Sequence, residues 1–287
     1  MERPTEHVRM LDAGRQRIAY SSPLTSSCFE SVASTKTQLL QHGNTFGLSF
    51  MATERGFGMI TNDEFETSCL DYCSRRQEAF DHGQKLTLKE IDELPVAKEI
   101  QLPSIAYWIA LSSDELMVAV AYANSVALYE VAHIIETVNP APFQTFSKLQ
   151  AQEIAWCTDS DRGRLAVLTL EKNVVVCTLD GAKHIIETHS DVSSISWSPS
   201  GEQIALGLVD STIAIYERSS LQIARSIGKP KCCADTDFEV HHVNWADEDL
   251  ILAGYQKYDE ENEETSTLAC IFEHGECMEL DEVVGFF

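Results

Sequence analysis

The sequence predicts an all-β fold in which one multistranded unit recurs along the chain, and three observations support this prediction. A hydrophobic-Ala pair recurs, and successive Ala residues of these pairs are 47, 39 and 48 positions apart. A large apolar residue stands before a polar turn upstream of each pair, and a second turn with an alternating strand such as TIAIY or SVALY follows. The pairs are Val118-Ala119, Leu165-Ala166, Ile204-Ala205 and Leu252-Ala253, and the upstream residues are Leu111, Trp156, Trp197 and Trp245.

A period of about 40–48 residues with several short strands per unit is typical of β-propeller blades. One four-stranded blade cannot cover both of its faces, so neighbouring blades stack and bury them. Burial of roughly 150–250 Å² per Trp would contribute roughly 4–6 kcal/mol each. We therefore interpret Leu111, Trp156, Trp197 and Trp245 as structural blade markers, and we expect a WD40-like β-propeller with about five recognisable blades.

The elements follow in order along the chain. Residues 1–36 are a polar, Ser-rich lead-in, and residues 37–287 form a partial propeller. We expect an insertion at residues 63–96, between the first and second blades, with a helical turn in the sequence LKEIDEL. The expected blades lie near residues 37–62, 97–131, 150–180, 190–218 and 238–280.

Composition excludes several classes of protein. At 287 residues and 44% hydrophobic the chain can bury a substantial core. Its formal net charge of −24 disfavours direct binding to nucleic acid or to an anionic membrane. The N-terminus lacks the apolar region of a secretory signal, and the longest apolar run, Leu116 to Ala123, is too short to span a bilayer. Nine cysteines in this context indicate reduced thiols of an intracellular protein.

No catalytic or metal-binding set is recognisable. The sequence has no GxSxG, phosphate-loop or HExxH motif, and no cofactor is expected. The adjacent Cys232-Cys233 are poor joint metal ligands, and no CxxC pair is present. We therefore interpret these residues, and the pair Cys69 and Cys73, as free buried or loop thiols. His241-His242 lies on an expected strand, where neighbours point to opposite faces, and we interpret it as structural.

Acidic residues are concentrated in the C-terminal part. Residues 234–287 contain sixteen Asp and Glu but one basic residue, Lys257. A run of five acids, expected in a loop between two strands of the fifth unit, is either a solvated loop or an electrostatic dock for a basic protein partner. The candidate partner-binding residues are Asp259, Glu260, Glu261, Glu263 and Glu264.

Several segments resemble a known family. The stretch LLQHGNTFGLSFMATERGFGMI, the unit IALSSDELMVAVAYANSVALYEV, the unit WSPSGEQIA and the segment VHHVNWADEDLILAGY are similar to the N-terminal β-propeller of a large phenylalanine-glycine nucleoporin of the pore's cytoplasmic filaments. The resemblance covers roughly residues 37–285. The pairs Phe46-Gly47 and Phe57-Gly58 lie in strand-like runs, and we interpret them as structural.

The resemblance implies a protein-interaction platform without enzymatic activity, located on the cytoplasmic face of the nuclear pore complex. In that family the propeller binds a DEAD-box RNA helicase during export of messenger RNA from the nucleus, and the implied partners are this helicase and other nucleoporins. The family propeller has seven blades, whereas the sequence ends after VVGFF, so we expect a truncated chain or a short homologue with an incomplete or open ring.

Two other functions stay open at this point. A generic WD40-type scaffold or adaptor, for translation or ubiquitin-ligase assembly, would show the same blade pattern. A propeller enzyme would carry its site on loops at the central channel. Location at the nuclear rim would favour the nucleoporin, and a diffuse cytosolic distribution would favour the scaffold.

Overall fold

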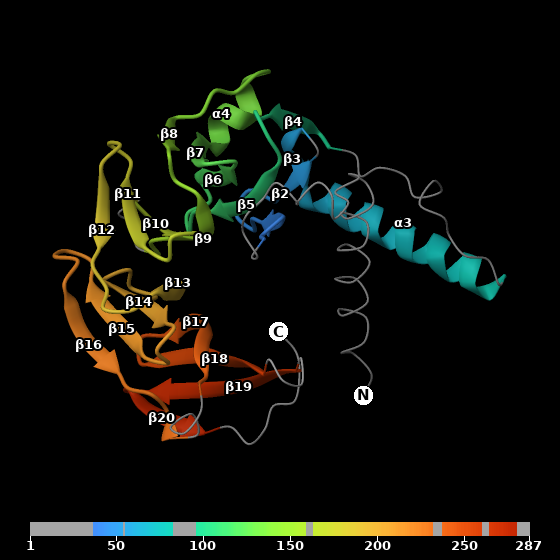
Figure 1. Ribbon diagram of the computed structural model, residues 1–287. Helices are drawn as coiled ribbons and strands as arrows, with labels where there is room; N and C mark the ends of the chain where they lie inside the picture. The colour runs from blue at the N-terminus through green and yellow to red at the C-terminus, as the bar shows by residue number, and fades with distance from the viewer. Residues whose placement is uncertain are drawn as a thin grey trace. The chain divides into compact units, whose positions relative to one another are not determined.

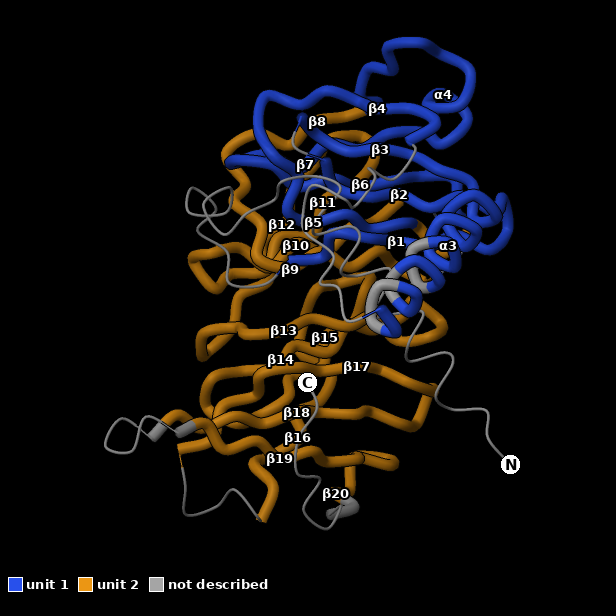
Figure 2. The backbone as a smooth tube through the Cα atoms, turned by 90° about the vertical axis from the view of Figure 1, so that its right-hand side faces the viewer, with its two compact units in different colours: residues 1–111, 115–143 blue, residues 112–114, 144–287 orange. Residues whose placement is uncertain are grey.

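The computed structural model describes residues 37–53, 55–82, 96–158, 163–231, 237–259 and 264–279. The chain divides into two compact units, the first comprising residues 1–111 and 115–143 and the second residues 112–114 and 144–287 (Figure 2). The described strands form five four-stranded antiparallel sheets, each with its strands adjacent in chain order (Figure 1). An all-β, propeller-type architecture with five blade-like sheets is therefore confirmed. The expected lead-in, residues 1–36, lies outside the described residues.

The first sheet takes its fourth strand from beyond the expected insertion, so our placement of residues 63–96 between two blades is wrong. Its strands are β1 (Leu40–His42), β2 (Leu48–Thr53), β3 (Gly56–Thr61) and β4 (Lys98–Gln101), and β4 pairs with β3. Met51 and Ile60 on this sheet pack with Phe65 of the helix that follows β3. The insertion thus interrupts the first sheet between its third and fourth strands.

That helix is α3 (Asn62–Asp81), which Figure 1 shows running away from β3. It begins with a capping box in which the Glu64 backbone N–H donates to Thr61 Oγ1 at 3.3 Å and the Glu64 carboxylate accepts from the Thr61 backbone N–H at 3.4 Å. The expected helical turn at LKEIDEL lies outside the described residues. Among the described residues, no helix combines the length and apolarity needed to cross a membrane.

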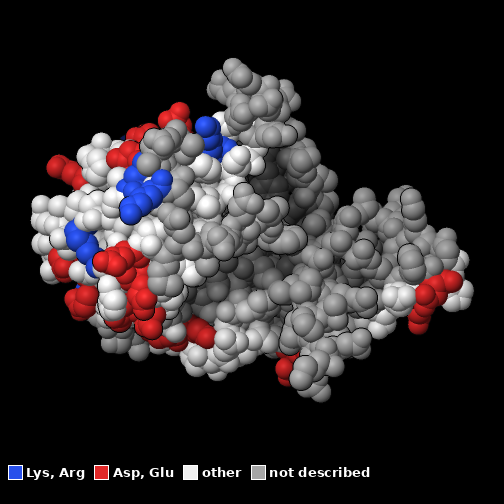
Figure 3. Space-filling view, turned by 90° about the horizontal axis from the view of Figure 1, so that it is seen from below, with Lys and Arg blue, Asp and Glu red and all other residues white. Residues whose placement is uncertain are grey.

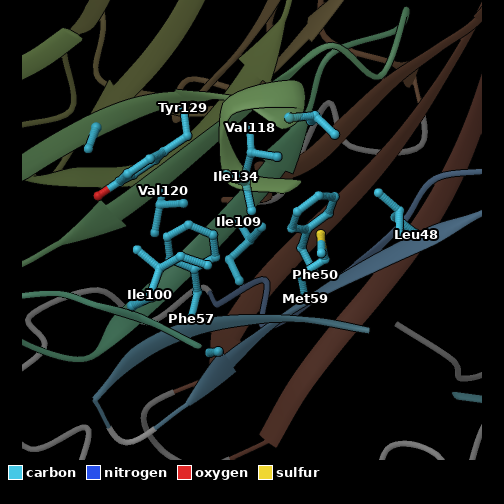
Figure 4. Packing of buried hydrophobic residues seen from close by; sticks show 14 residues of the cluster. Leu48, Phe50, Phe57, Met59, Ile100, Ile109, Val118, Val120, Tyr129 and Ile134 are labelled. Atoms are coloured by element: carbon cyan, nitrogen blue, oxygen red, sulfur yellow. The ribbon is translucent and has the colours of Figure 1, made fainter. Parts of the chain in front are cut away.

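The second sheet takes its first three strands from the first unit. It has the order β5 (Ala106–Leu111), β6 (Met117–Tyr122), β7 (Ser125–Glu130) and β8 (Gln144–Ser147), and the short helix α4 (Val131–Glu136) follows β7. Strand β6 is buried on both faces over Met117–Ala121. A shared core joins this sheet to β2 and β3 of the first sheet, and its central rings, Phe57 and Tyr129, meet edge to face with centroids 5.2 Å apart (Figure 4).

The second unit contains the next three sheets along the chain. Each of the first two has a short, exposed fourth strand that our sequence boundaries omit, because an edge strand facing water lacks apolar alternation. The strands are β9 (Ala151–Trp156), β10 (Arg164–Thr169), β11 (Val174–Thr178), β12 (Lys183–Ile186), β13 (Val192–Trp197), β14 (Gln203–Leu208), β15 (Ile213–Glu217), β16 (Ile223–Ile227), β17 (Glu239–Asp247), β18 (Leu250–Asp259), β19 (Glu264–Glu273) and β20 (Glu276–Glu279).

The three Trp markers are buried at or near the ends of their strands. Trp156 is 8% exposed, Trp197 4% and Trp245 5%. The fourth marker, Leu111, is partly buried. Trp156 and Trp197 lie opposite Leu165 and Ile204, the residues that precede the repeated Ala. Trp245 instead lies opposite Ile251, so the pair Leu252-Ala253 was aligned one residue too late. The periodicity holds once Leu252 is taken as the equivalent of the repeated Ala.

The first strands of the sheets in the second unit are joined by side chains that satisfy backbone N–H groups. The Ile195 N–H donates to Glu153 Oε1 at 3.3 Å, and the Val243 N–H donates to Ser194 Oγ at 3.2 Å. The Trp245 N–H donates to Ser196 Oγ at 2.9 Å. The first strand of a four-stranded sheet has one edge that its own sheet leaves unpaired, and here the preceding sheet supplies the acceptors. This network fixes the position of β17 and therefore of the last sheet, to which β17 belongs.

Candidate protein interface

The last sheet carries a hairpin that is longer than those of the other described sheets. Strands β18 and β19 have ten residues each and pair without a register shift from Leu250 opposite Glu273 to Asp259 opposite Glu264. Strand β17 pairs with β18 only as far as Gln256. The last three residue pairs of the hairpin therefore extend past β17, and Figure 1 shows β18 and β19 as long neighbouring arrows.

The base of this hairpin is firmly anchored. Val243 and Trp245 on β17 pack with Ile251 and Tyr255 on β18 and with Phe272 on β19, and all are at most 5% exposed. Residues of β14 and β15 complete the same apolar cluster. Because the base is part of a core, the projecting end is held on a rigid support rather than on a loose loop.

The first and last residues of the acidic run predicted to bind a partner lie at the projecting end. Asp259 is the last residue of β18 and Glu264 the first of β19, and their backbones pair. Glu260, Glu261 and Glu263 lie between them in sequence and outside the described residues. Beside the tip, Tyr258 is 59% exposed. The hairpin thus brings both ends of the acidic run together next to an exposed aromatic ring.

Charged side chains are distributed unevenly over the described surface. Figure 3 shows acidic side chains gathered in patches on the face that it presents. On the three strands β18, β19 and β20 the acidic residues are Asp259, Glu264, Glu273, Glu276 and Glu279, and Lys257 is the basic residue. Among these residues Glu273 and Glu276 are exposed, and exposed carboxylates attract a cationic partner over about a Debye length, roughly 8 Å at physiological ionic strength.

The cysteines and histidines show no sign of redox or metal chemistry in the part of the chain that is described. Cys69 is buried on α3, and Cys232-Cys233 lies outside the described residues. Burial raises the pKa of the Cys177 thiol to about 12, more than Lys183 lowers it, so this thiol stays protonated. His241 and His242 are exposed on β17, and no group of three or more His, Cys, Asp or Glu among the described residues could hold a metal ion.

Sequence reasoning missed a carboxylate that joins the first two sheets. Glu115, in the turn between β5 and β6, accepts backbone N–H bonds from Asn44 at 2.7 Å, Thr45 at 2.8 Å and Phe46 at 3.2 Å. Partial burial alone would raise the pKa of Glu115, but these donors outweigh it and the pKa lies below its ordinary value of 4.5. A Cβ on Gly43 would lie 2.6 Å from Glu115 Oε2, so a larger residue here would displace the Glu115 carboxylate.

The same turn shows that our strand placement of one of the two Phe-Gly pairs is wrong. Phe46-Gly47 lies in the turn before β2 rather than in a strand, and 47% of Phe46 is exposed. Gly47 has φ of +62°, a conformation that favours glycine. Phe57 of the second pair is fully buried on β3, as expected for a structural residue.

A second missed constellation links two turns in the second unit. His189 Nε2 lies 3.0 Å from Asp210 Oδ2, and the same carboxylate accepts from the Thr212 N–H at 3.0 Å and from Thr212 Oγ1 at 2.6 Å. Burial raises the pKa of Asp210, but the bonds from Thr212 and His189 outweigh it and lower that pKa overall. The arrangement closes the β14–β15 turn and fixes it to the segment before β13.

Comparisons with known proteins agree with this architecture. The chain is 24% identical to the nuclear pore complex protein Nup214 of Drosophila melanogaster over 168 residues, which are 55% of this chain and 10% of that protein. The chain thus spans about a tenth of the length of this relative.

Two solved structures share the fold at low sequence identity. A β-propeller domain of Cps50 (Swd1) from Myceliophteria thermophila matches with a TM-score of 0.54 and 8% identity, covering 85% of each chain. A chain of the mitotic checkpoint complex matches with a TM-score of 0.50 and 15% identity, covering 81% of this chain and 63% of that one. The profile of the family described as NUP159/214 beta propeller matches residues 77–273. This chain belongs to the NUP159/214 β-propeller family.

Proposed function

We propose that this propeller is a protein-docking platform of the nuclear pore complex, on its cytoplasmic face, that engages the basic surface of a DEAD-box RNA helicase during export of messenger RNA. The observation that carries the proposal is the acidic end of the β18–β19 hairpin, raised past β17 on a buried base. Membership of a nucleoporin propeller family supports the location.

Electrostatics gives this platform a specific role. Acidic residues at a projecting tip accelerate association with a basic partner more than they tighten the complex, and salt screens the effect. Direct binding to RNA or to an anionic membrane does not fit the net charge of −24. Other nucleoporins are the second class of partner that we expect, through the remaining surface.

The experiment measures the dissociation constant of the full chain for the helicase at low and at physiological salt. The test variant carries Asp259→Asn with Glu260, Glu261, Glu263 and Glu264 changed to Gln. A matched control carries Asp63→Asn with Glu66, Glu78, Glu99 and Glu136 changed to Gln, all exposed residues of the first unit. Both variants lose the same number of negative charges. A difference in their binding to the helicase would therefore report a local role of the hairpin.

We expect the hairpin variant to bind at least tenfold more weakly at low salt, and the control to bind like the wild type. If both variants bind the helicase equally weakly, the loss of affinity comes from net charge alone and not from the hairpin. Unchanged binding of the hairpin variant would contradict the proposal. Fluorescence microscopy of the tagged chain tests the location. A nuclear-rim signal supports a pore component, whereas a diffuse cytosolic signal favours a generic WD40-type scaffold.

A further inference from the structure

The β18–β19 hairpin has a second property, which concerns its backbone rather than its charge. Strand β20 pairs with β19 only over Cys270–Glu273. In the described part of the chain, no strand pairs with the outer edge of β19 between Glu264 and Ala269. This six-residue stretch is a strand edge beside an acidic tip.

The register shows which backbone groups face this edge. The His274 N–H donates to the Asp249 carbonyl at 2.9 Å, just beyond the pair Leu250 and Glu273. In an antiparallel ladder, alternate residues direct both of their backbone polar groups to the same neighbour. With no register shift along β19, the even-numbered residues face β18, and Thr265, Thr267 and Ala269 direct their N–H and C=O groups to the outer edge.

The turn between β19 and β20 supports the same assignment independently. His274 and Gly275 have φ of 51° and 89° and connect the pair Glu273 and Glu276 by a two-residue turn. A tight turn with positive φ at both central positions closes on a hydrogen-bonded pair. Glu273 therefore faces β20, and so do the residues two, four, six and eight positions before it, including Thr267 and Thr265.

The side chains along this edge suit an added strand. Thr265, Ser266 and Thr267 are exposed, uncharged and short, and Thr is among the residues favoured in strands. The charge nearby selects the occupant: the described strands β18–β20 carry five acidic residues and one lysine. A second copy of this chain would bring like charges together, which disfavours edge-to-edge pairing between copies.

We propose that the outer edge of β19 over Glu264–Ala269 binds an extended, lysine- or arginine-rich segment of a partner protein as an additional strand. The proposal rests on the proposed docking function and gives its mode of recognition. Backbone hydrogen bonds to Thr265 and Thr267 supply affinity and register, and the acidic residues select basic side chains.

The test uses a synthetic peptide of alternating Lys and Val, long enough to cover Glu264–Ala269, and a copy that is N-methylated at every second residue. N-methylation removes the peptide's donors but keeps its charge. On the protein side, Thr267→Pro removes one edge N–H and leaves the ladder to β18 in place, and Thr267→Val is the matched control that keeps the N–H.

We expect the wild type and Thr267→Val to bind the peptide at least tenfold more tightly than they bind its N-methylated copy. We also expect them to bind the unmodified peptide at least tenfold more tightly than Thr267→Pro does. Hydrogen exchange of the Thr265 and Thr267 amides should slow on binding and be fast in the unbound chain. This exchange measurement keeps the proposal testable even if Thr267→Pro fails to fold.

Equal binding of the N-methylated peptide would overturn the proposal, and so would slow exchange of both amides before the peptide is added. The same variants separate this inference from the proposed function. If helicase binding depends on the five acids but Thr267→Pro binds like Thr267→Val, only the added-strand mode is wrong. If the five-acid variant binds the helicase as the wild type does, the proposed function itself is wrong.

Discussion

Replacing Ser194 by Ala should weaken the connection between three successive sheets. The Ser194 hydroxyl is fully buried, donates to Glu153 Oε1 at 3.3 Å and accepts the Val243 N–H at 3.2 Å. Loss of a hydrogen bond to a charged group costs about 1.5–3 kcal/mol, and a buried N–H without an acceptor costs about 1–3 kcal/mol. Glu153 keeps its hydrogen bond from the Ile195 N–H. We therefore expect Ser194→Ala to lower the free energy of unfolding by about 2–4 kcal/mol, less than the sum of the two costs.

The assay is urea denaturation followed by circular dichroism, with the slope of the unfolding free energy checked against the wild type. Ser220→Ala is the matched control, since Ser220 is exposed and its Oγ accepts only a local N–H from Gln222 in the described contacts. The control should change the unfolding free energy by less than about 0.5 kcal/mol. A loss below about 0.5 kcal/mol for Ser194→Ala, or no coupling to Glu153→Gln in a double-mutant cycle, would refute the reasoning.

Three further predictions concern other contacts. Glu115→Gln should lower stability at neutral pH by about 1–3 kcal/mol, because three backbone N–H groups lose a charged acceptor. Since the folded pKa of Glu115 is lowered, its stabilisation is present above the unfolded pKa and is lost as the pH falls through the folded value. Thermal unfolding from pH 7 to pH 3 should therefore show a shallower acid decline in the variant, and parallel curves would contradict this. Phe57→Ala should cost about 3–5 kcal/mol in the same denaturation assay, because it empties the fully buried position beside Tyr129; a cost under about 1 kcal/mol would mean that the ring is not a core residue. Gly207→Ala should destabilise by about 1–3 kcal/mol, since the new Cβ would lie 2.5 Å from Val240 Cγ1, and a more stable variant would show that β14 and β17 do not approach so closely.

The inner strands could be predicted because their sequence pattern is dictated by burial. In the unit built around Trp197, alternating apolar residues, the turn Ser-Pro-Ser-Gly and the pair Ile204-Ala205 correspond directly to β13 and β14. A strand that is buried on both faces, such as β6, needs apolar residues on both, and the run MVAVAY shows this.

The outer strands could not be predicted, because water covers them and no apolar period marks them. Strand β16 is exposed over Ile223–Ser226, and the first sheet's β4 follows a long excursion of the chain. The start of α3 was visible in principle, since Thr61 and Glu64 form a capping box in the sequence. The charged, irregular composition after Asn62 instead favours an insertion.

The candidate site was partly accessible to sequence reasoning. The acidic run and its place between two strands follow from composition, and the structure puts Asp259 and Glu264 opposite each other. The extension past β17 and the edge of β19 that no described strand pairs depend on the lengths of neighbouring strands, which no local pattern encodes. The role of Glu115 could not be predicted, because the N–H groups that donate to its carboxylate belong to a turn about 70 residues earlier in the chain.

The most direct test of the docking account is the association rate constant with the helicase, measured by stopped flow as a function of ionic strength. The account predicts that this rate constant falls at least tenfold between low and physiological salt for the wild type. In the five-acid hairpin variant the dependence should be much weaker, while the dissociation rate constant changes little. The same steep dependence in the variant and in the wild type would contradict the account.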